Sequence, residues 1–219
     1  MTPPAWLRHQ GERPVLPGEL VALAFVRFDA DHFHAGVLYA DLDERHHLLH
    51  LAFHHRLERT TGFAEYVFVV PALDPEVAKN IAAMCERVWK VHQQIGVPYG
   101  LRYSGGTFDT QGKLQLASDE VGLTCSTFPL AVFAAAGFRL VDPASWPERE
   151  DDHRKQEELL ALLQKHGASD EHVSQARQQV GSKRIRPEEV AGAGSAATFP
   201  CTFAVAGLAG EHIRRTLEA

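Results

Sequence analysis

The stretch from Thr124 to Gly137, TCSTFPLAVFAAAG, decides the fold that we expect. Its residues from Phe128 onward are apolar on almost every side of a helix, which is typical of a helix in the middle of a core. We therefore predict a helix over Thr124–Ala136, ended by Gly137. Cys125 stands at the N-terminal end of this helix, with hydroxyl side chains on both sides.

Upstream of this helix the pattern predicts an antiparallel sheet. Short apolar runs bounded by polar or turn-forming residues are typical of strands. Such runs lie at 20–26, 33–39, 48–53 and 66–70, with a polar hairpin turn at 41–45. Asp74 and Pro75 begin a helix with an apolar stripe from Val77 to Ile95. The fold class that we predict is α+β, with the sheet packed on the helix that carries Cys125.

The composition changes after Asp142-Pro143, and we divide the chain there. Residues 1–143 are the predicted core, 144–182 a helical insertion or extension, and 183–219 a C-terminal segment that packs back on the core. The middle segment carries charges on one side and leucines on the other, which predicts surface helices running to about Val180. Further on we expect a short strand at 183–187, a loop at 191–197 and a terminal helix at 207–217.

The composition argues against several classes of protein. The 219 residues carry 22 basic and 28 acidic side chains, a net charge of −6, which disfavours nucleic acid as a partner. No apolar run reaches the roughly 20 residues that a membrane span needs. The N-terminus lacks the pattern of an export signal, so we expect a cytoplasmic protein, with signal-independent secretion left open. Three cysteines without paired spacing indicate free thiols.

Cys125 is the strongest candidate for chemistry. A thiol at a helix N-terminus lies near the positive end of the helix dipole and near unpaired backbone N–H groups. Both favour the nucleophilic thiolate, and the same N–H groups can hold an oxyanion. The competing interpretation is that Cys125 is a small residue that fills a contact between helix and sheet. Cys85 and Cys201 have apolar surroundings and are interpreted as packing residues.

Histidines supply the other groups that a cysteine nucleophile needs, a base and a residue that orients it. Strand alternation places His34 with Gly36 on one face of its strand, and His50 with His54 on one face of the next. A turn centred on Leu42 would make His34 and His50 cross-strand neighbours, and a slip of one residue would separate them. Four further histidines are expected to be exposed at loops and strand ends: His46, His47, His54 and His55. A metal site that includes His32 and His34 is the rival interpretation, although no paired ligand spacing supports it.

The order of these motifs resembles that of a known family. His34-Ala35-Gly36-Val37-Leu38, then Leu48-Leu49-His50-Leu51, then Thr124-Cys125-Ser126-Thr127-Phe128 resemble the NlpC-type papain-like thiol hydrolases, as does Leu16-Pro17-Gly18-Glu19-Leu20 before them. The similarity is to their circularly permuted branch, which includes the lecithin:retinol acyltransferase-like enzymes. The resemblance implies a papain-like core with Cys125 as nucleophile, His34 as general base and His50 as the residue that orients it.

The resemblance also implies a function, and this sequence departs from the family pattern at two places. Gly96-Val97-Pro98-Tyr99 matches a family motif whose tyrosine serves the oxyanion site, so Tyr99, with Ser126, is a candidate there. We expect a thiol hydrolase or acyltransferase without a cofactor, acting on a small-molecule, peptide or lipid-like acyl substrate. A catalytically silent binding module is the alternative. Pro129 is unusual so near the nucleophile, because it crowds the carbonyl of Cys125. Residues 144–182 have no family counterpart and are a candidate lid, oligomer contact or surface for a protein partner.

Overall fold

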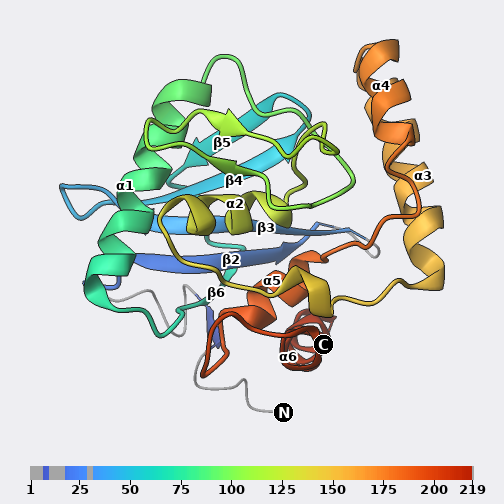
Figure 1. Cartoon of the computed structure of the whole chain (residues 1–219). Coiled ribbons are helices and arrows are strands. Elements are labelled where there is room, and N and C mark those ends of the chain that lie inside the picture. The colour runs from blue at the N-terminus through green and yellow to red at the C-terminus, as the bar shows by residue number, and fades with distance from the viewer. Residues whose placement is uncertain (1–6, 10–17, 29–31, 219) are drawn as a thin grey trace.

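A computed structural model describes residues 7–9, 18–28 and 32–218 of the chain. Its centre is a six-stranded antiparallel sheet with strand order β1-β6-β2-β3-β4-β5 (Figure 1). The strands are β1 (Leu7–His9), β2 (Val21–Arg27), β3 (Phe33–Ala40), β4 (His46–Phe53), β5 (Arg56–Thr60) and β6 (Val67–Val69). The α+β class and all four predicted strands are confirmed. Leu16 and Pro17 of the first motif lie outside the described residues.

Helices follow the sheet along the chain. They are α1 (Pro75–His92), α2 (Thr127–Ala135), α3 (Glu150–Lys165), α4 (Asp170–Arg177), α5 (Pro187–Ala193) and α6 (Phe203–Glu218). A small ribbon of β7 (Thr107–Phe108) and β8 (Leu114–Gln115) lies in the irregular stretch before α2. Among the described residues, no helix is both long and apolar enough to cross a membrane.

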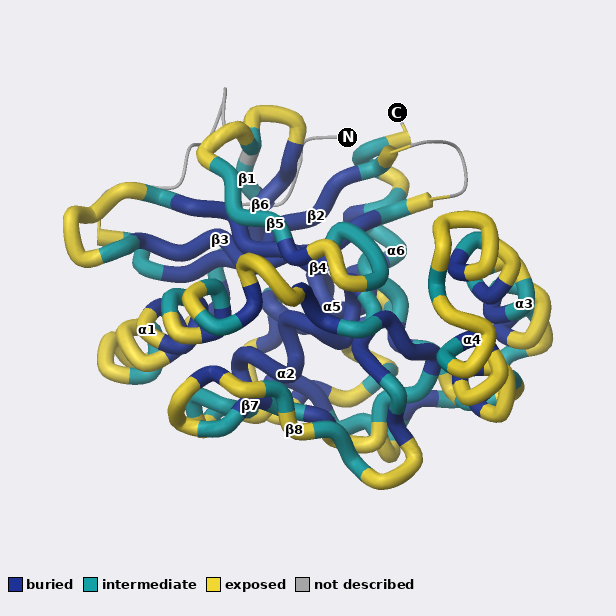
Figure 2. Tube along the Cα trace, turned by 90° about the horizontal axis from the view of Figure 1, so that it is seen from above, coloured by how far each residue is buried: buried dark blue, intermediate teal, exposed yellow. Residues whose placement is uncertain are grey.

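The two faces of the sheet bury different side chains. Odd-numbered residues of β3 and β4, such as Val37 and Leu49, pack with α1, α2 and α5 in the main core. Even-numbered residues, such as Leu38 and Leu48, form a second apolar cluster with Phe68 on the other face. Figure 2 shows the strands as a buried layer, with exposed residues on the outer sides of α1 and α3. The first seven residues of α2, residues 127–133, are buried because the helix lies between the sheet and the β7–β8 ribbon.

Helix α1 begins and ends for the reasons that its sequence suggests. The carboxylate of Asp74 accepts the N–H of Glu76, and Pro75 occupies the first turn. Gly96 adopts a positive φ of 69°, and its Cα lies so close to the backbone of His55 that an added Cβ would collide with the His55 carbonyl oxygen. The predicted stripe ends early, because Ile95 lies beyond the helix and is 62% exposed.

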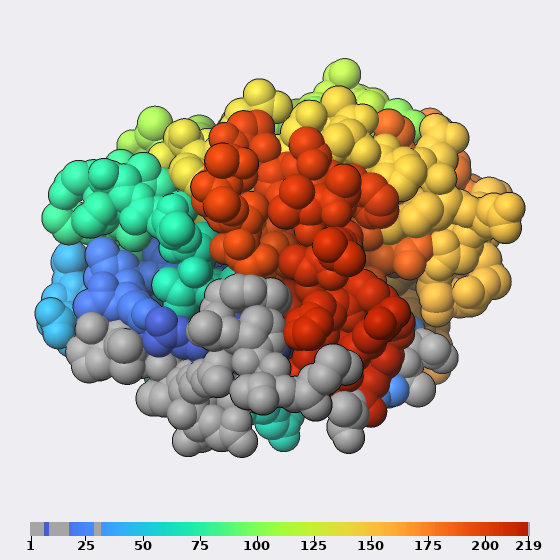
Figure 3. Space-filling view, turned by 90° about the horizontal axis from the view of Figure 1, so that it is seen from below, coloured from blue at the N-terminus to red at the C-terminus, as the bar shows by residue number. Residues whose placement is uncertain are grey.

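The C-terminal third contains two separate parts. Helices α3 and α4 form a hairpin that stands beside the core, whereas α5 and α6 pack on each other and on the sheet. Figure 3 shows the red C-terminal segment spread over the lower face between α1 and α3. The short strand predicted at 183–187 is wrong, because Pro187 begins α5 there. Residues 191–193 likewise belong to α5, whose small side chains allow close contact with α6.

The hairpin of β3 and β4 has a register that the sequence did not reveal. Val37 pairs with Leu49 and Ala40 with His46, so the turn is centred on residue 43 and not on Leu42. His50 therefore lies level with Gly36 instead of His34, and the predicted direct pairing is wrong. A slip of one residue in the turn centre moves the pairing by two residues, which keeps both histidines on the same face.

Candidate active site

A cavity of about 520 Å³ opens at the N-terminal end of α2. Cys125, Ser126, Tyr99 and His34, four of the five predicted site residues, line one side of it. The opposite side is built by α3, by the segment between α4 and α5, and by α6. Residues of the predicted segment 144–182 thus form part of the cavity wall, and all three predicted divisions of the chain contribute to one site.

Helix α2 presents Cys125 through an unusual first turn. The Thr124 side chain accepts the N–H of Thr127 at 3.1 Å, and the Thr127 hydroxyl accepts the N–H of Thr124 at 2.8 Å. This reciprocal pair caps the helix in the manner of a capping box. Regular helix begins only at Thr127, so the crowding expected from Pro129 is resolved by a start beyond Cys125. Pro129 has no N–H, so it cannot donate to the Cys125 carbonyl.

Three groups surround the Cys125 sulfur. The hydroxyl of Tyr99 lies 3.8 Å from it and that of Ser126 lies 3.9 Å from it. The third is the backbone N–H of Ala35, which hydrogen-bonds to the thiolate form. That N–H is free for the sulfur because the β3–β4 ladder stops at Val37 and Leu49. The end of the hairpin is therefore open where the tip of α2 meets it.

His34 and His50 form a direct hydrogen bond. Nε2 of His34 lies 2.7 Å from Nδ1 of His50, and both rings are buried. Nε2 of His50 lies 3.6 Å from a carboxylate oxygen of Glu58, which is level with it on β5. At this distance the contact is electrostatic and not a hydrogen bond. If the Nε2–H of His50 faces the Glu58 carboxylate, Nδ1 of His50 must accept from His34, which leaves Nδ1 of His34 with a lone pair. Sequence reasoning missed Glu58, because β5 itself was not predicted.

Gly36 makes room for this histidine pair. A Cβ on Gly36 would lie 2.9 Å from Cβ of His50 and 3.0 Å from the carbonyl oxygen of Leu49. A contact of 2.9 Å forces one of the two strands to shift, so glycine is the residue that fits opposite His50 without strain. The His-x-Gly motif therefore has a steric reason: glycine lets β4 approach closely enough for His50 to reach His34 on the same face.

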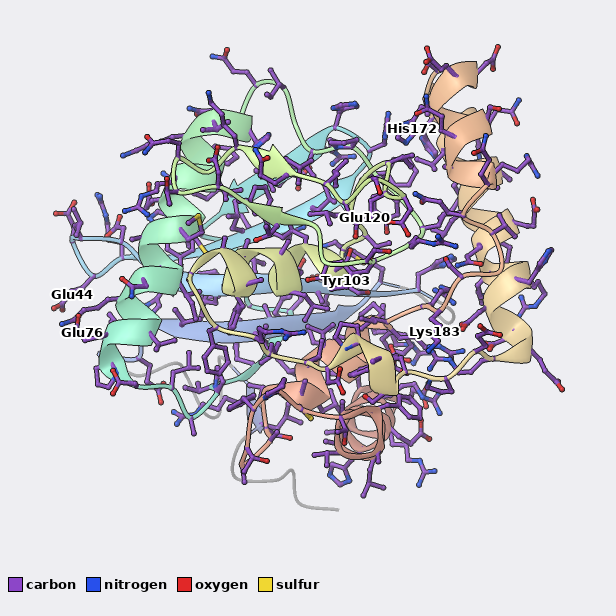
Figure 4. All side chains as sticks on the ribbon, viewed as in Figure 1. Glu44, Glu76, Tyr103, Glu120, His172 and Lys183 are labelled. Carbon is purple, nitrogen blue, oxygen red and sulfur yellow. The ribbon has the colours of Figure 1, made fainter. Side chains whose placement is uncertain are left out.

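Two histidines hold the backbone of Tyr99 from both sides. Nδ1 of His54 accepts the N–H of Tyr99 at 3.1 Å, and Nε2 of His172 lies 2.7 Å from its carbonyl oxygen. The centroids of the two imidazole rings are 4.3 Å apart, and the rings are tilted by 46°. Figure 4 shows His172 on the side of α4 that faces the core loops. His172 thus ties the α3–α4 hairpin to the residue whose hydroxyl faces Cys125, a role that no local sequence signal indicated.

Burial dominates the titration of the site. It raises the pKa of the Cys125 thiol, and the opposing effects are hydrogen bonds from Tyr99, Ala35 and Ser126 and the charge of Arg184. Burial also lowers the pKa of His34 to about 4, against the charge of Glu58. The thiolate that the helix terminus was expected to favour is therefore outweighed. These shifts keep both Cys125 and His34 neutral near pH 7.

The remaining histidines only partly match the prediction of exposure. His55 is exposed in the β4–β5 turn, but His47 is buried against Asp41, whose carboxylate lies 2.9 Å from Nε2. His54 is withdrawn from solvent by its bond to Tyr99.

The rival metal interpretation needs three ligands to converge, and across residues 7–9, 18–28 and 32–218 no such group of histidine, cysteine and acidic side chains is found.

Cys85 and Cys201 differ from Cys125 in their surroundings. Both are buried among apolar side chains, and burial raises the pKa of each thiol. Neither lines the cavity.

Comparisons of the chain with protein-family models, with curated proteins and with solved structures found no match.

Proposed function

We propose that this chain is a cysteine-dependent hydrolase or acyltransferase with a papain-like core of the permuted NlpC type. One observation carries the proposal: Cys125 and His34 line the same cavity, and His34 is hydrogen-bonded behind it to His50. A nucleophile, a base and a group that orients the base are the parts that acyl transfer through a thiol requires.

The mechanism follows from the atoms available. His34 takes the thiol proton on Nδ1 while its Nε2–H stays bonded to His50. The Cys125 sulfur attacks the carbonyl carbon of an amide or ester, and the carbonyl π electrons move to its oxygen. That oxyanion is placed near the Tyr99 hydroxyl and the Cys125 N–H, which already lie 3.4 Å apart. The C–N or C–O bond then breaks, and His34 returns the proton to the leaving group.

The acyl-enzyme is resolved by the same groups in reverse. His34 takes a proton from water or from an acceptor, which attacks the thioester carbonyl and releases the Cys125 thiolate for reprotonation. His50 stabilises the imidazolium in both halves, and Glu58 adds a compensating negative charge behind it. Hydrolysis and acyl transfer share the first half-reaction and differ only in the nucleophile of the second.

The test is alkylation of the native protein by iodoacetamide between pH 5 and 9, read separately for each cysteine by mass spectrometry. Cys85 and Cys201 are internal controls for buried thiols. We expect Cys125 to react much faster than both, and His34→Ala to slow it by about 10²-fold, the usual contribution of a general base. Equal reactivity of the three cysteines would overturn the proposal.

A catalytically silent binding module is the second candidate, and the burial of the Cys125 thiol favours it. Cys125 is only 8% exposed, and its pKa is raised instead of lowered. A slow Cys125 whose rate is unaffected by His34→Ala would support this second candidate.

A further inference from the structure

The charges that line the cavity are mostly neutralised among themselves. Its wall opposite Cys125 holds several cations and carboxylates. Three ion pairs account for most of them: Arg186 with Asp151 at 2.6 Å, Lys155 with Glu158 at 3.0 Å, and Arg214 with Glu211 at 2.9 Å. Two adjacent cations, Lys183 and Arg184, and the carboxylate of Glu188 also line the cavity and are outside these three pairs. Figure 4 shows Lys183 on the segment that runs between the core and α3.

The guanidinium of Arg184 is partly buried and has no carboxylate within hydrogen-bond distance. Its side chain is 20% exposed, and its nearest carboxylate oxygen, on Asp152, is 3.7 Å away, which is too long for a hydrogen bond. The Asp152 carboxylate is shared with Arg149 and Arg186, which both approach it more closely. In the part of the chain that the structure describes, the guanidinium of Arg184 donates no hydrogen bond. A partly buried guanidinium with unused donors favours an anion from outside.

The position of Arg184 relates it to the reacting atoms. Its charge lowers the pKa of both Cys125 and Tyr99, although burial raises each of them further. Its backbone carbonyl accepts a hydrogen bond from Arg149 at 2.6 Å, which fixes the chain where the side chain enters the cavity. Apolar side chains line the space between the two walls, among them Phe53, Leu101, Leu159 and Leu162.

We propose that Arg184, with Lys183 beside it, binds an anionic group of the substrate, so that the enzyme prefers acyl compounds bearing a carboxylate or phosphate near the scissile bond. This inference rests on the proposed function and names its substrate class. The planar guanidinium matches two oxygens of either group, whereas Lys183 adds a point charge at the cavity rim. The apolar lining takes the hydrocarbon part of the same molecule.

The first experiment compares two alkylating reagents that differ in charge. Iodoacetate and iodoacetamide both alkylate the Cys125 thiolate, and the ratio of their rates cancels any change in the amount of thiolate. We expect Arg184→Met to lower the iodoacetate-to-iodoacetamide ratio about tenfold, the usual effect of losing a hydrogen bond to a charged group. Arg184→Lys keeps the charge without the planar fork and is expected to lose part of the preference.

A matched control variant separates local from general charge effects. Arg177→Met removes one positive charge from α4, where the exposed Arg177 pairs with Glu157 and does not line the cavity. Its ratio of rates is expected to equal that of the unmodified protein. A ratio that stays unchanged in Arg184→Met, or that falls equally in Arg177→Met, overturns the inference while leaving the proposed function intact.

The second experiment does not depend on a reactive Cys125. Calorimetry measures the binding of hexanoate, hexyl phosphate and the neutral hexanamide to the intact chain and to Arg184→Met. We expect one or both anions to bind more tightly than hexanamide, and the advantage to disappear in Arg184→Met. The stronger anion identifies carboxylate or phosphate as the recognised group. Equal binding of all three overturns the inference, and slow alkylation of Cys125 beside selective anion binding refutes only the proposed catalysis.

Discussion

Substitution of Gly36 by alanine tests the connection between the sheet and the site. The added Cβ would lie 2.9 Å from Cβ of His50 and 3.0 Å from the carbonyl oxygen of Leu49. Neither atom can rotate away, because one is part of the backbone and the other is attached to it. Strand β4 must therefore retreat by about 0.5 Å to restore ordinary contact.

The energy change follows from two opposing effects. Overpacking of this kind costs about 1–3 kcal/mol, whereas replacing a strand glycine by alanine gains about 0.5–1 kcal/mol of backbone entropy. We expect a net loss of about 1–2 kcal/mol, which at a urea m-value of about 2 kcal/mol/M lowers the midpoint of unfolding by about 0.5–1 M. The retreat of β4 also lengthens the bond between His50 and His34, so iodoacetamide should alkylate Cys125 more slowly.

Gly62→Ala is the matched control, because the nearest atom to its added Cβ is the Thr60 hydroxyl at an ordinary 3.5 Å. Urea unfolding and alkylation of Cys125 are measured for both variants. Unchanged stability and unchanged alkylation in Gly36→Ala would show that β4 does not press against Gly36, and the reasoning about the histidine pair would be refuted.

Three further outcomes are expected. Burial lowers the pKa of His34 and of His50 to about 4, so the unfolded chain binds more protons than the folded chain below pH 6.5. The free energy of unfolding measured in urea should therefore fall by about 3 kcal/mol between pH 7 and pH 5. A free energy of unfolding that does not change over this range would contradict the prediction. Glu58 raises the pKa of His34, so Glu58→Gln should move the acidic limb of Cys125 alkylation to lower pH, not higher. His172→Ala frees the carbonyl of Tyr99, so the amide of that residue should exchange hydrogen faster; unchanged exchange would show that α4 does not hold it.

Local signals predicted the elements of the fold well. Apolar runs marked β2, β3, β4 and β6, and the Asp74-Pro75 pair marked the start of α1, because strand alternation and helix capping depend on neighbours in the chain. Prediction was wrong at 183–187, where the apolar and basic residues suggested a strand. Pro187 there begins α5, whose small residues pack on α6, and only the distant partner explains that choice.

The site divides in the same way. From the sequence alone, the periodicity of single elements predicts that Cys125 precedes an apolar helix and that His34 and His50 each lie on one face of a regular strand. Only the tertiary structure shows the register that places His50 level with Gly36 and on the same face as His34, the burial that keeps the thiol protonated, and the position of Arg184 at the cavity. Each of these depends on segments that are far apart in the chain. Local sequence patterns depend only on neighbouring residues, so they do not predict burial or electrostatic coupling between such segments.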